Sequence, residues 1–251
     1  MSQHERVALI TGGSRGIGRA IALKLAEDGV RRFVINYYNN REAADEVVDQ
    51  LANSGAEAVT FRGDVGDLNY LNQMFDFVGE KFGKLDIFIS NAAAGAFKAA
   101  LELSPKSWQR TLDINSRTFL IGSQRAAALM PETGGHIVGL TSLGSQRFIP
   151  GYAAIGVAKA AIETLTRYLA VELAPRQITV NAVSGGVVDT DSLKYFPNYQ
   201  ELLDVTANRT PMGRVGKPED IATVVAFLCS PGARWICGQT IIVDGGYSLL
   251  A

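Results

Sequence analysis

The feature that most constrains the fold of this chain is the alternation of short apolar runs with amphipathic stretches. Runs rich in β-branched residues at 6–10, 33–36, 58–61, 85–89, 135–141, 178–183 and 240–243 predict strands. Stretches with helical periodicity lie between them, at 16–28, 41–53, 68–82, 104–130, 151–173 and 219–229. Strands and helices at this spacing form right-handed βαβ crossovers. We therefore predict an α/β fold, a doubly wound and mostly parallel seven-stranded sheet, as a single domain over 1–251.

Composition and charge exclude several classes of protein. Apolar residues make up 47% and charged residues 20% of the 251 residues, as in ordinary globular proteins. No apolar run approaches the roughly 20 residues that span a bilayer, and residues 1–6 lack a signal-peptide core. Twenty-four basic and 25 acidic residues leave a net charge of −1, so no field attracts nucleic acid. Two cysteines and two histidines supply neither a disulfide framework nor a metal site. The expectation is a cytoplasmic, metal-free protein that binds neither nucleic acid nor membrane.

A glycine-rich turn connects the first predicted strand to the first predicted helix. It reads Thr11-Gly12-Gly13-Ser14-Arg15-Gly16-Ile17-Gly18, with the spacing T-G-x-x-x-G-x-G. Glycines there allow positive φ and let backbone N–H groups approach a pyrophosphate at the helix N-terminus. The alternative is a tight turn without a ligand. The strand-turn-helix context favours a Rossmann-type dinucleotide site, with Gly12, Ser14, Arg15, Gly16, Ile17 and Gly18 as candidate cofactor-binding residues.

The end of the second predicted strand indicates which dinucleotide binds. An acidic residue there would bind the adenosine 2′-hydroxyl and repel a 2′-phosphate. This strand continues into Tyr37 and Arg41, with no carboxylate before Glu42, and Arg15 adds positive charge nearby. The alternative for Arg41 is a solvated helix start. We predict NADPH as the cofactor, with Tyr37 in its site.

The glycine spacing and a series of later motifs resemble the short-chain dehydrogenase/reductase family. The resemblance covers essentially the whole chain, and the ending Val243-Asp244-Gly245-Gly246 is also typical of it. Two departures from the family pattern are Ala93 and Gly185, which replace a glycine and a proline. Further cofactor-binding residues that the resemblance implies are Asp64 and Val65 after strand three, Asn91, Ala92 and Ala93 after strand four, and Gly186, Val188 and Thr190 after strand six; the implied catalytic positions are Asn115, Ser142 and Lys159.

The catalytic tyrosine departs most from the family pattern. The family places it thirteen residues after the serine, but this position holds Ile155, while Lys159 stands where the family lysine belongs. The nearest tyrosine is Tyr152, in a Y-x6-K spacing. Seven helical residues turn through about 700°, so both side chains lie within about 20° of one line, roughly 10 Å apart along the axis. Tyr152 is therefore the candidate proton donor, unless it is only a packing residue. Ser142 is an auxiliary catalytic group or only caps its loop, and Asn115 is catalytic or only braces the backbone.

A displaced phenol suits the reduction of an enoyl thioester. Hydride then goes to the β-carbon, and charge builds on an oxygen two bonds further away than in a ketone. The spacing resembles the NADPH-dependent third type of bacterial enoyl-acyl-carrier-protein reductase. This resemblance implies fatty-acid elongation, an acyl thioester on acyl carrier protein as substrate, and a homotetramer. Two alternatives stay open: a 3-ketoacyl or other carbonyl reductase, and a catalytically silent dinucleotide-binding protein.

The segment at 191–214 falls outside the strand-helix rhythm. By family analogy it forms a substrate lid, and apolar residues such as Leu193, Leu202 and Met212 are candidates to line an acyl tunnel. The alternative is a surface helix that packs its own apolar stripe. Lys194, Arg209, Arg214 and Lys217 are basic candidates for contact with an acidic carrier protein.

Overall fold

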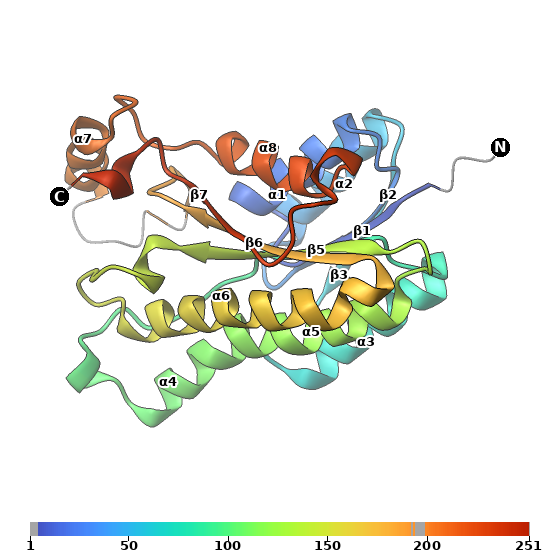
Figure 1. Ribbon diagram of the computed structural model, residues 1–251, viewed down its shortest axis with the longest axis horizontal. Helices are drawn as coiled ribbons and strands as arrows, with labels where there is room; N and C mark the ends of the chain where they lie inside the picture. Colours follow the sequence, from blue (N-terminus) through green and yellow to red (C-terminus); the bar gives the residue numbers. More distant parts are fainter. Residues whose placement is uncertain (1–4, 192, 194–198, 251) are drawn as a thin grey trace.

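Seven parallel strands form one sheet in the order β3-β2-β1-β4-β5-β6-β7 (Figure 1). The computed structural model describes residues 5–191, 193 and 199–250. The strands are β1 (Val7–Ile10), β2 (Arg32–Tyr37), β3 (Glu57–Arg62), β4 (Ile87–Ser90), β5 (Gly135–Ser142), β6 (Ile178–Gly185) and β7 (Thr240–Val243). The chain reverses its direction of travel across the sheet between β3 and β4, which confirms the doubly wound prediction. Ligands of such sheets bind at the carboxyl ends of the strands near this switch.

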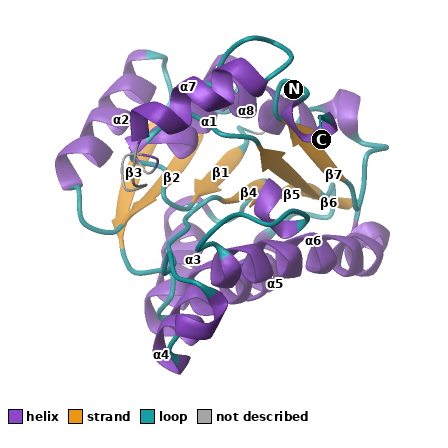
Figure 2. Cartoon of the chain, turned by 90° about the vertical axis from the view of Figure 1, so that its left-hand side faces the viewer, coloured by secondary structure: helices purple, strands orange, loops and turns teal. Residues whose placement is uncertain are grey.

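Helices cover both faces of the sheet, as Figures 1 and 2 show. One layer contains α1 (Gly16–Glu27), α2 (Arg41–Asn53) and α8 (Pro218–Leu228), and α1 packs against α8. The other layer contains α3 (Leu68–Phe82), α4 (Pro105–Leu112), α5 (Thr118–Leu129) and α6 (Ala153–Leu173). The helix α7 (Tyr199–Arg209) lies close to the C-terminal end of the chain, away from the N-terminus.

Alternation along β1 explains why the sheet needs two helical layers. Ala8 and Ile10 belong to the apolar core under α1 and α8, whereas Val7 and Leu9 belong to the core under α3, α5 and α6. All four side chains are fully buried. A strand that is apolar on both faces can be buried only between two layers.

The predicted helix at 104–130 is interrupted. It consists of α4 and α5 joined by a π-helical turn at Asp113–Arg117, and Asn115 lies in this turn. One extra residue in a helical turn shifts the side chains that follow it, and such turns are frequent at functional sites. The helix predicted from residue 151 begins at Ala153, so Tyr152 is its N-cap.

The predicted lid contains α7, whose start is tied to the β6 side of the molecule. The Tyr199 hydroxyl donates to Asp189 at 2.6 Å. Thr206 is the buried residue of this helix, and Leu202 is half-buried. Residues 192 and 194–198 of the predicted lid, including Lys194, lie outside the described residues. In the part of the chain that the structure describes, no helix combines the length and apolar character that crossing a bilayer requires.

Candidate active site

The glycine turn forms a cradle that side chains would fill. Gly12 and Gly16 have positive φ values of 61° and 53°. A Cβ on Gly18 would meet the carbonyl oxygen of Gly12 and lie 2.6 Å from Nδ2 of Asn91. Arg15, the N-cap of α1, makes no side-chain capping hydrogen bond, so the first N–H groups of the helix face the turn. Free N–H groups at a helix N-terminus fit a dinucleotide pyrophosphate.

Two asparagines hold the turn in place. Asn91 donates from Nδ2 to the carbonyl oxygens of Thr11 and Gly12, both at 3.0 Å. The N–H groups of Asn91 and Ala92 both donate to the Thr11 hydroxyl. On the other side, Asn36 accepts from the Gly12 N–H at 3.2 Å and donates to Gly63. Asn91 and Ala92 therefore brace the cradle, and Asn36 does so without a sequence signal beyond its place at the end of β2.

The end of β2, where the sequence predicts the adenosine, holds more positive charge than the sequence indicated. Tyr37 is 6% exposed, and its register partner is Arg62, which donates to the Tyr38 carbonyl oxygen at 3.4 Å. Sequence reasoning missed Arg62 because strand pairing, not chain order, brings it beside the end of β2. Arg41 is 81% exposed and pairs with Asp45 in its own helix.

Asp64 and Val65 follow β3 as the family pattern requires. The Asp64 carboxylate forms an ion pair with Arg110 of α4 and accepts from the Gly66 N–H at 2.9 Å. Val65 is buried. A role for Asp64 in adenine binding stays a prediction. An adenine bound there would share the Asp64 carboxylate with Arg110.

The segment after β6 reaches the glycine turn. Thr190 lies against Gly16, where a Cβ would meet its methyl group at 3.4 Å. Val188 is buried and pairs with Gly216, and Gly186 packs so closely on Asp244 that a Cβ would lie 2.8 Å from the aspartate Cβ. Thr190 therefore lies at the glycine turn, and a cofactor-binding role for Gly186, Val188 and Thr190 stays a prediction. Ser14 is buried, Ile17 is half-buried and Ala93 is exposed at the same edge.

Tyr152 and Ser142 form a pair. The Tyr152 hydroxyl lies 3.2 Å from Oγ of Ser142, which ends β5. Tyr152 is the N-cap of α6, with φ −101° and ψ 8°, and therefore lies outside the regular helix. The ideal helical spacing that placed its side chain on one line with Lys159 does not apply to it. Its ring packs beside Phe97 with centroids 6.0 Å apart. The displaced tyrosine thus reaches the serine from the turn before α6, ten residues along the chain.

Ile155 fills the position where the family has its tyrosine. It is 5% exposed and packs against Gly95, where a Cβ would lie 2.9 Å from Cδ1 of the isoleucine. Ile155 is therefore a buried packing residue, and the proton-donor role of Tyr152 stays a prediction.

Lys159 is buried in α6 and bonds to the β5 backbone. Its Nζ donates to the carbonyl oxygen of Leu140 at 2.8 Å, and burial lowers the pKa of Lys159 to about 8. Burial raises the pKa of Tyr152, while its hydrogen bond with Ser142 acts in the opposite direction. Burial therefore sets the direction of the shift in the pKa of Tyr152. The ammonium group of Lys159 is held at the β5 backbone.

Asn115 braces the loop after β4. Its Nδ2 donates to the carbonyl oxygens of Ala94 and Thr111, both at 2.8 Å. Its Oδ1 is buried without a hydrogen-bond partner among the described residues, which is rare for a native polar atom.

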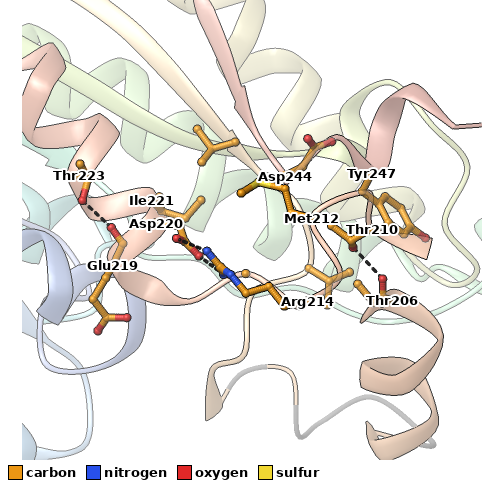
Figure 3. A pocket seen from close by; sticks show the side chains of 14 residues that line it. Thr206, Thr210, Met212, Arg214, Glu219, Asp220, Ile221, Thr223, Asp244 and Tyr247 are labelled. Carbon is orange, nitrogen blue, oxygen red and sulfur yellow. Dashed lines mark hydrogen bonds and ion pairs between the residues drawn. The ribbon is translucent and has the colours of Figure 1, made fainter. Parts of the chain in front are cut away.

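A separate cavity of about 350 Å³ lies between α7, the start of α8 and the C-terminal turn (Figure 3). Arg214 donates two hydrogen bonds to Asp220 across it, at 2.6 and 2.8 Å, and this pairing lowers the pKa of Asp220 to about 2. Ser142, Tyr152 and Lys159 do not line it. Among the described residues, no group of three or more His, Cys, Asp or Glu side chains is placed to hold a metal ion.

Comparisons with known proteins agree with this architecture. The family model described as "Enoyl-(Acyl carrier protein) reductase" matches residues 12–248. The 1-cyclohexenylcarbonyl-CoA reductase of Streptomyces collinus is 43% identical over 252 residues, covering 100% of this chain and 89% of that protein.

Solved structures match over the same length. A short-chain dehydrogenase/reductase variant from Serratia marcescens is 34% identical, with a TM-score of 0.90 over 97% of this chain and 98% of that one. An angucycline C-6 ketoreductase, LanV, with bound NADP is 34% identical, with a TM-score of 0.89 over 98% and 96% of the two chains. This chain belongs to the short-chain dehydrogenase/reductase family and is a nicotinamide-dinucleotide-dependent oxidoreductase.

Proposed function

We propose that the protein uses NADPH to reduce the conjugated double bond of an enoyl thioester. The observation that carries this proposal is the replacement of the family tyrosine by buried Ile155, with the phenol supplied by Tyr152 beside Ser142. A phenol that enters from the turn before α6 suits an acceptor oxygen three bonds from the carbon that receives hydride, two bonds further than in a ketone. The name of the Streptomyces collinus relative denotes a coenzyme A thioester with a ring double bond next to its carbonyl group.

The carrier of the acyl group stays part of the proposal. The family model's description contains acyl carrier protein, whereas the relative's name contains coenzyme A. We propose a coenzyme A thioester as the first substrate to test, and an acyl-carrier-protein thioester of fatty-acid elongation as the second. Basic residues near the predicted lid, such as Arg209 and Lys217, are the candidates to contact an acidic carrier.

The residues of the site have separate roles in the proposed reaction. When bound, NADPH supplies the hydride. The cradle of Gly12, Gly16 and Gly18 holds the pyrophosphate at the start of α1. The Tyr152 hydroxyl donates a hydrogen bond to the thioester oxygen and stabilises the charge that develops there. Addition of one proton to the α-carbon then completes the reduction. Ser142 holds that hydroxyl in place from 3.2 Å.

Carbonyl reduction is the second candidate, and the names of relatives support it more broadly. LanV is named a ketoreductase, and another structural neighbour, 32% identical, is described as catalysing keto-reduction at C1. Contact between the serine and the tyrosine hydroxyls also suits a ketone, because both can hydrogen-bond one carbonyl oxygen.

One assay separates the two candidates. Purified protein is supplied with NADPH and either a trans-2-enoyl coenzyme A thioester or the matching 3-ketoacyl thioester, and cofactor oxidation is followed. We expect turnover of the enoyl substrate, lost in Tyr152→Phe with NADPH affinity retained. Turnover of the ketone alone would assign carbonyl reduction, and binding of NADPH without turnover of any substrate would favour the silent dinucleotide-binding protein.

We also propose a homotetramer. One face of α6 carries exposed apolar side chains at Val157, Tyr168 and Val171, spaced so that they share a side of the helix. A second copy of the chain would cover this face.

A further inference from the structure

Glu163 is a buried carboxylate outside the groups that the proposed reaction uses. It lies in α6, one turn after Lys159, and is 8% exposed. A buried carboxylate is costly unless hydrogen bonds compensate it. The hydrogen-bond partners of Glu163 therefore indicate which part of the structure it stabilises.

All three partners of Glu163 lie in one short segment at the end of β5. Oε1 accepts from the Thr141 hydroxyl at 2.9 Å and from the Ser145 hydroxyl at 2.5 Å. Oε2 accepts from the side-chain amide of Gln146 at 3.3 Å. Thr141 and Ser145 lie on either side of Ser142 in the chain, so one carboxylate fixes both flanks of the serine.

The same segment carries the ring of Tyr152. A Cβ on Gly144 would lie 2.5 Å from Cε1 of this ring, so the phenol rests on the glycine backbone. A Cβ on Gly156 would in turn meet the Gly144 carbonyl oxygen at 2.5 Å, which presses the segment against α6. Figure 1 shows α6 running along β5. Position of the phenol therefore depends on where residues 142–145 lie relative to α6.

We infer that Glu163 is a positioning residue that clamps residues 141–146 to α6 and so holds Ser142 and Tyr152 in their reactive geometry. The inference rests on the proposed reductase activity at that pair. It applies to reduction of the double bond or of the carbonyl group alike. The three donors, two hydroxyls and a side-chain amide, are all uncharged. The clamp therefore consists of hydrogen bonds to the carboxylate and not of ion pairs.

If the Glu163 carboxylate is removed, two of its donors still have other hydrogen-bond acceptors nearby. The Ser145 hydroxyl also lies 2.8 Å from the carbonyl oxygen of Ser142, and the Thr141 hydroxyl lies 3.4 Å from that of Lys159. Both hydroxyls can turn to these acceptors. A substitution at Glu163 is thus expected to loosen the segment rather than unfold the protein.

The test compares three variants of the full-length protein. Glu163→Leu removes all acceptors, Glu163→Gln keeps a carbonyl oxygen that can accept from Thr141 and Ser145, and Glu172→Leu is a control at an exposed position of the same helix. With the thioester that the wild type reduces, Glu163→Leu should lower kcat by about 10- to 100-fold, the cost of misplacing a reacting group by about 1 Å. KM for NADPH should change less than about twofold, since the cradle is untouched. Glu163→Gln should restore most of kcat, and the control should match the wild type.

Hydrogen exchange supplies a second readout that needs no substrate. The N–H groups of Gln146 and Arg147 both donate to the Leu143 carbonyl oxygen. They should exchange faster in Glu163→Leu than in the wild type or the control, with the rest of the chain unchanged.

Any of three results would overturn the inference. The first is that Glu163→Leu has the kcat and the exchange rates of the wild type. The second is faster exchange over the whole chain of Glu163→Leu, and the third is a kcat of Glu163→Gln as low as that of Glu163→Leu. If the wild type reduces neither thioester, the proposed function fails, and the local exchange rates alone decide the role of Glu163.

Discussion

Replacement of Gly144 by alanine tests whether the displaced phenol acts in the reduction. The added Cβ would meet Cδ1 of the Tyr152 ring and lie 2.5 Å from Cε1. Non-bonded carbons approach to about 3.5–4.0 Å at their optimum, so the ring must move by about 1 Å. Gly144 is not among the glycines with positive φ, so alanine suits its backbone, and the closest clash is with the ring, followed by Cδ1 of Ile149 at 3.3 Å.

The expected effect is a loss of turnover. Displacement by about 1 Å stretches the 3.2 Å contact with Ser142 and costs about 100-fold in kcat, or about 2.7 kcal/mol in activation free energy. Steady-state oxidation of NADPH with saturating thioester measures kcat, and a fluorescence titration measures NADPH affinity, which should stay within about twofold of the wild type.

Two controls make the result decisive. Gly232→Ala places a Cβ no closer than 3.6 Å to any neighbour and should leave kcat unchanged. In a Tyr152→Phe background, Gly144→Ala should lower kcat little further, because both changes act on one group. Full turnover in Gly144→Ala, or simple additivity in the double variant, would refute the assignment of Tyr152.

Three further predictions concern the cofactor, acid stability and assembly. Arg62→Ala should raise KM for NADPH by about 10-fold with a smaller effect on KM for NADH, since its charge lies beside the end of β2; equal effects on both cofactors would remove it from the 2′-phosphate site. Burial lowers the pKa of His136 to about 4, so the unfolded chain takes up the proton first and stability falls as pH drops from about 6.5 towards 4. Denaturant titrations should show a loss of about 2 kcal/mol between pH 7 and pH 5 from this group, absent in His136→Gln. Sedimentation should show a tetramer that Val171→Asp dissociates, and an unchanged assembly would place the subunit contact elsewhere.

The sequence by itself determined the layered fold and its cofactor edge. Apolar periodicity is local information, and it identified all seven strands and most helices to within a few residues. Positive φ at Gly12 and Gly16 was likewise predictable, because only glycine adopts it readily. The same local pattern missed the π-helical turn at Asn115, because the packing of the side chains that follow it, and not the apolar pattern, decides whether the helix takes in one extra residue.

Only the tertiary structure decided how the site is assembled. Spacing placed Tyr152 on a helical line with Lys159, but the residue is an N-cap whose hydroxyl meets Ser142, and Lys159 donates to the β5 backbone. The carboxylate of Glu163 showed no motif, because its three partners lie about twenty residues earlier in the chain. Contacts of this kind depend on how a strand end, a loop and a helix pack together. No local sequence pattern encodes that packing, whereas the apolar periodicity of each segment predicts its strand or helix.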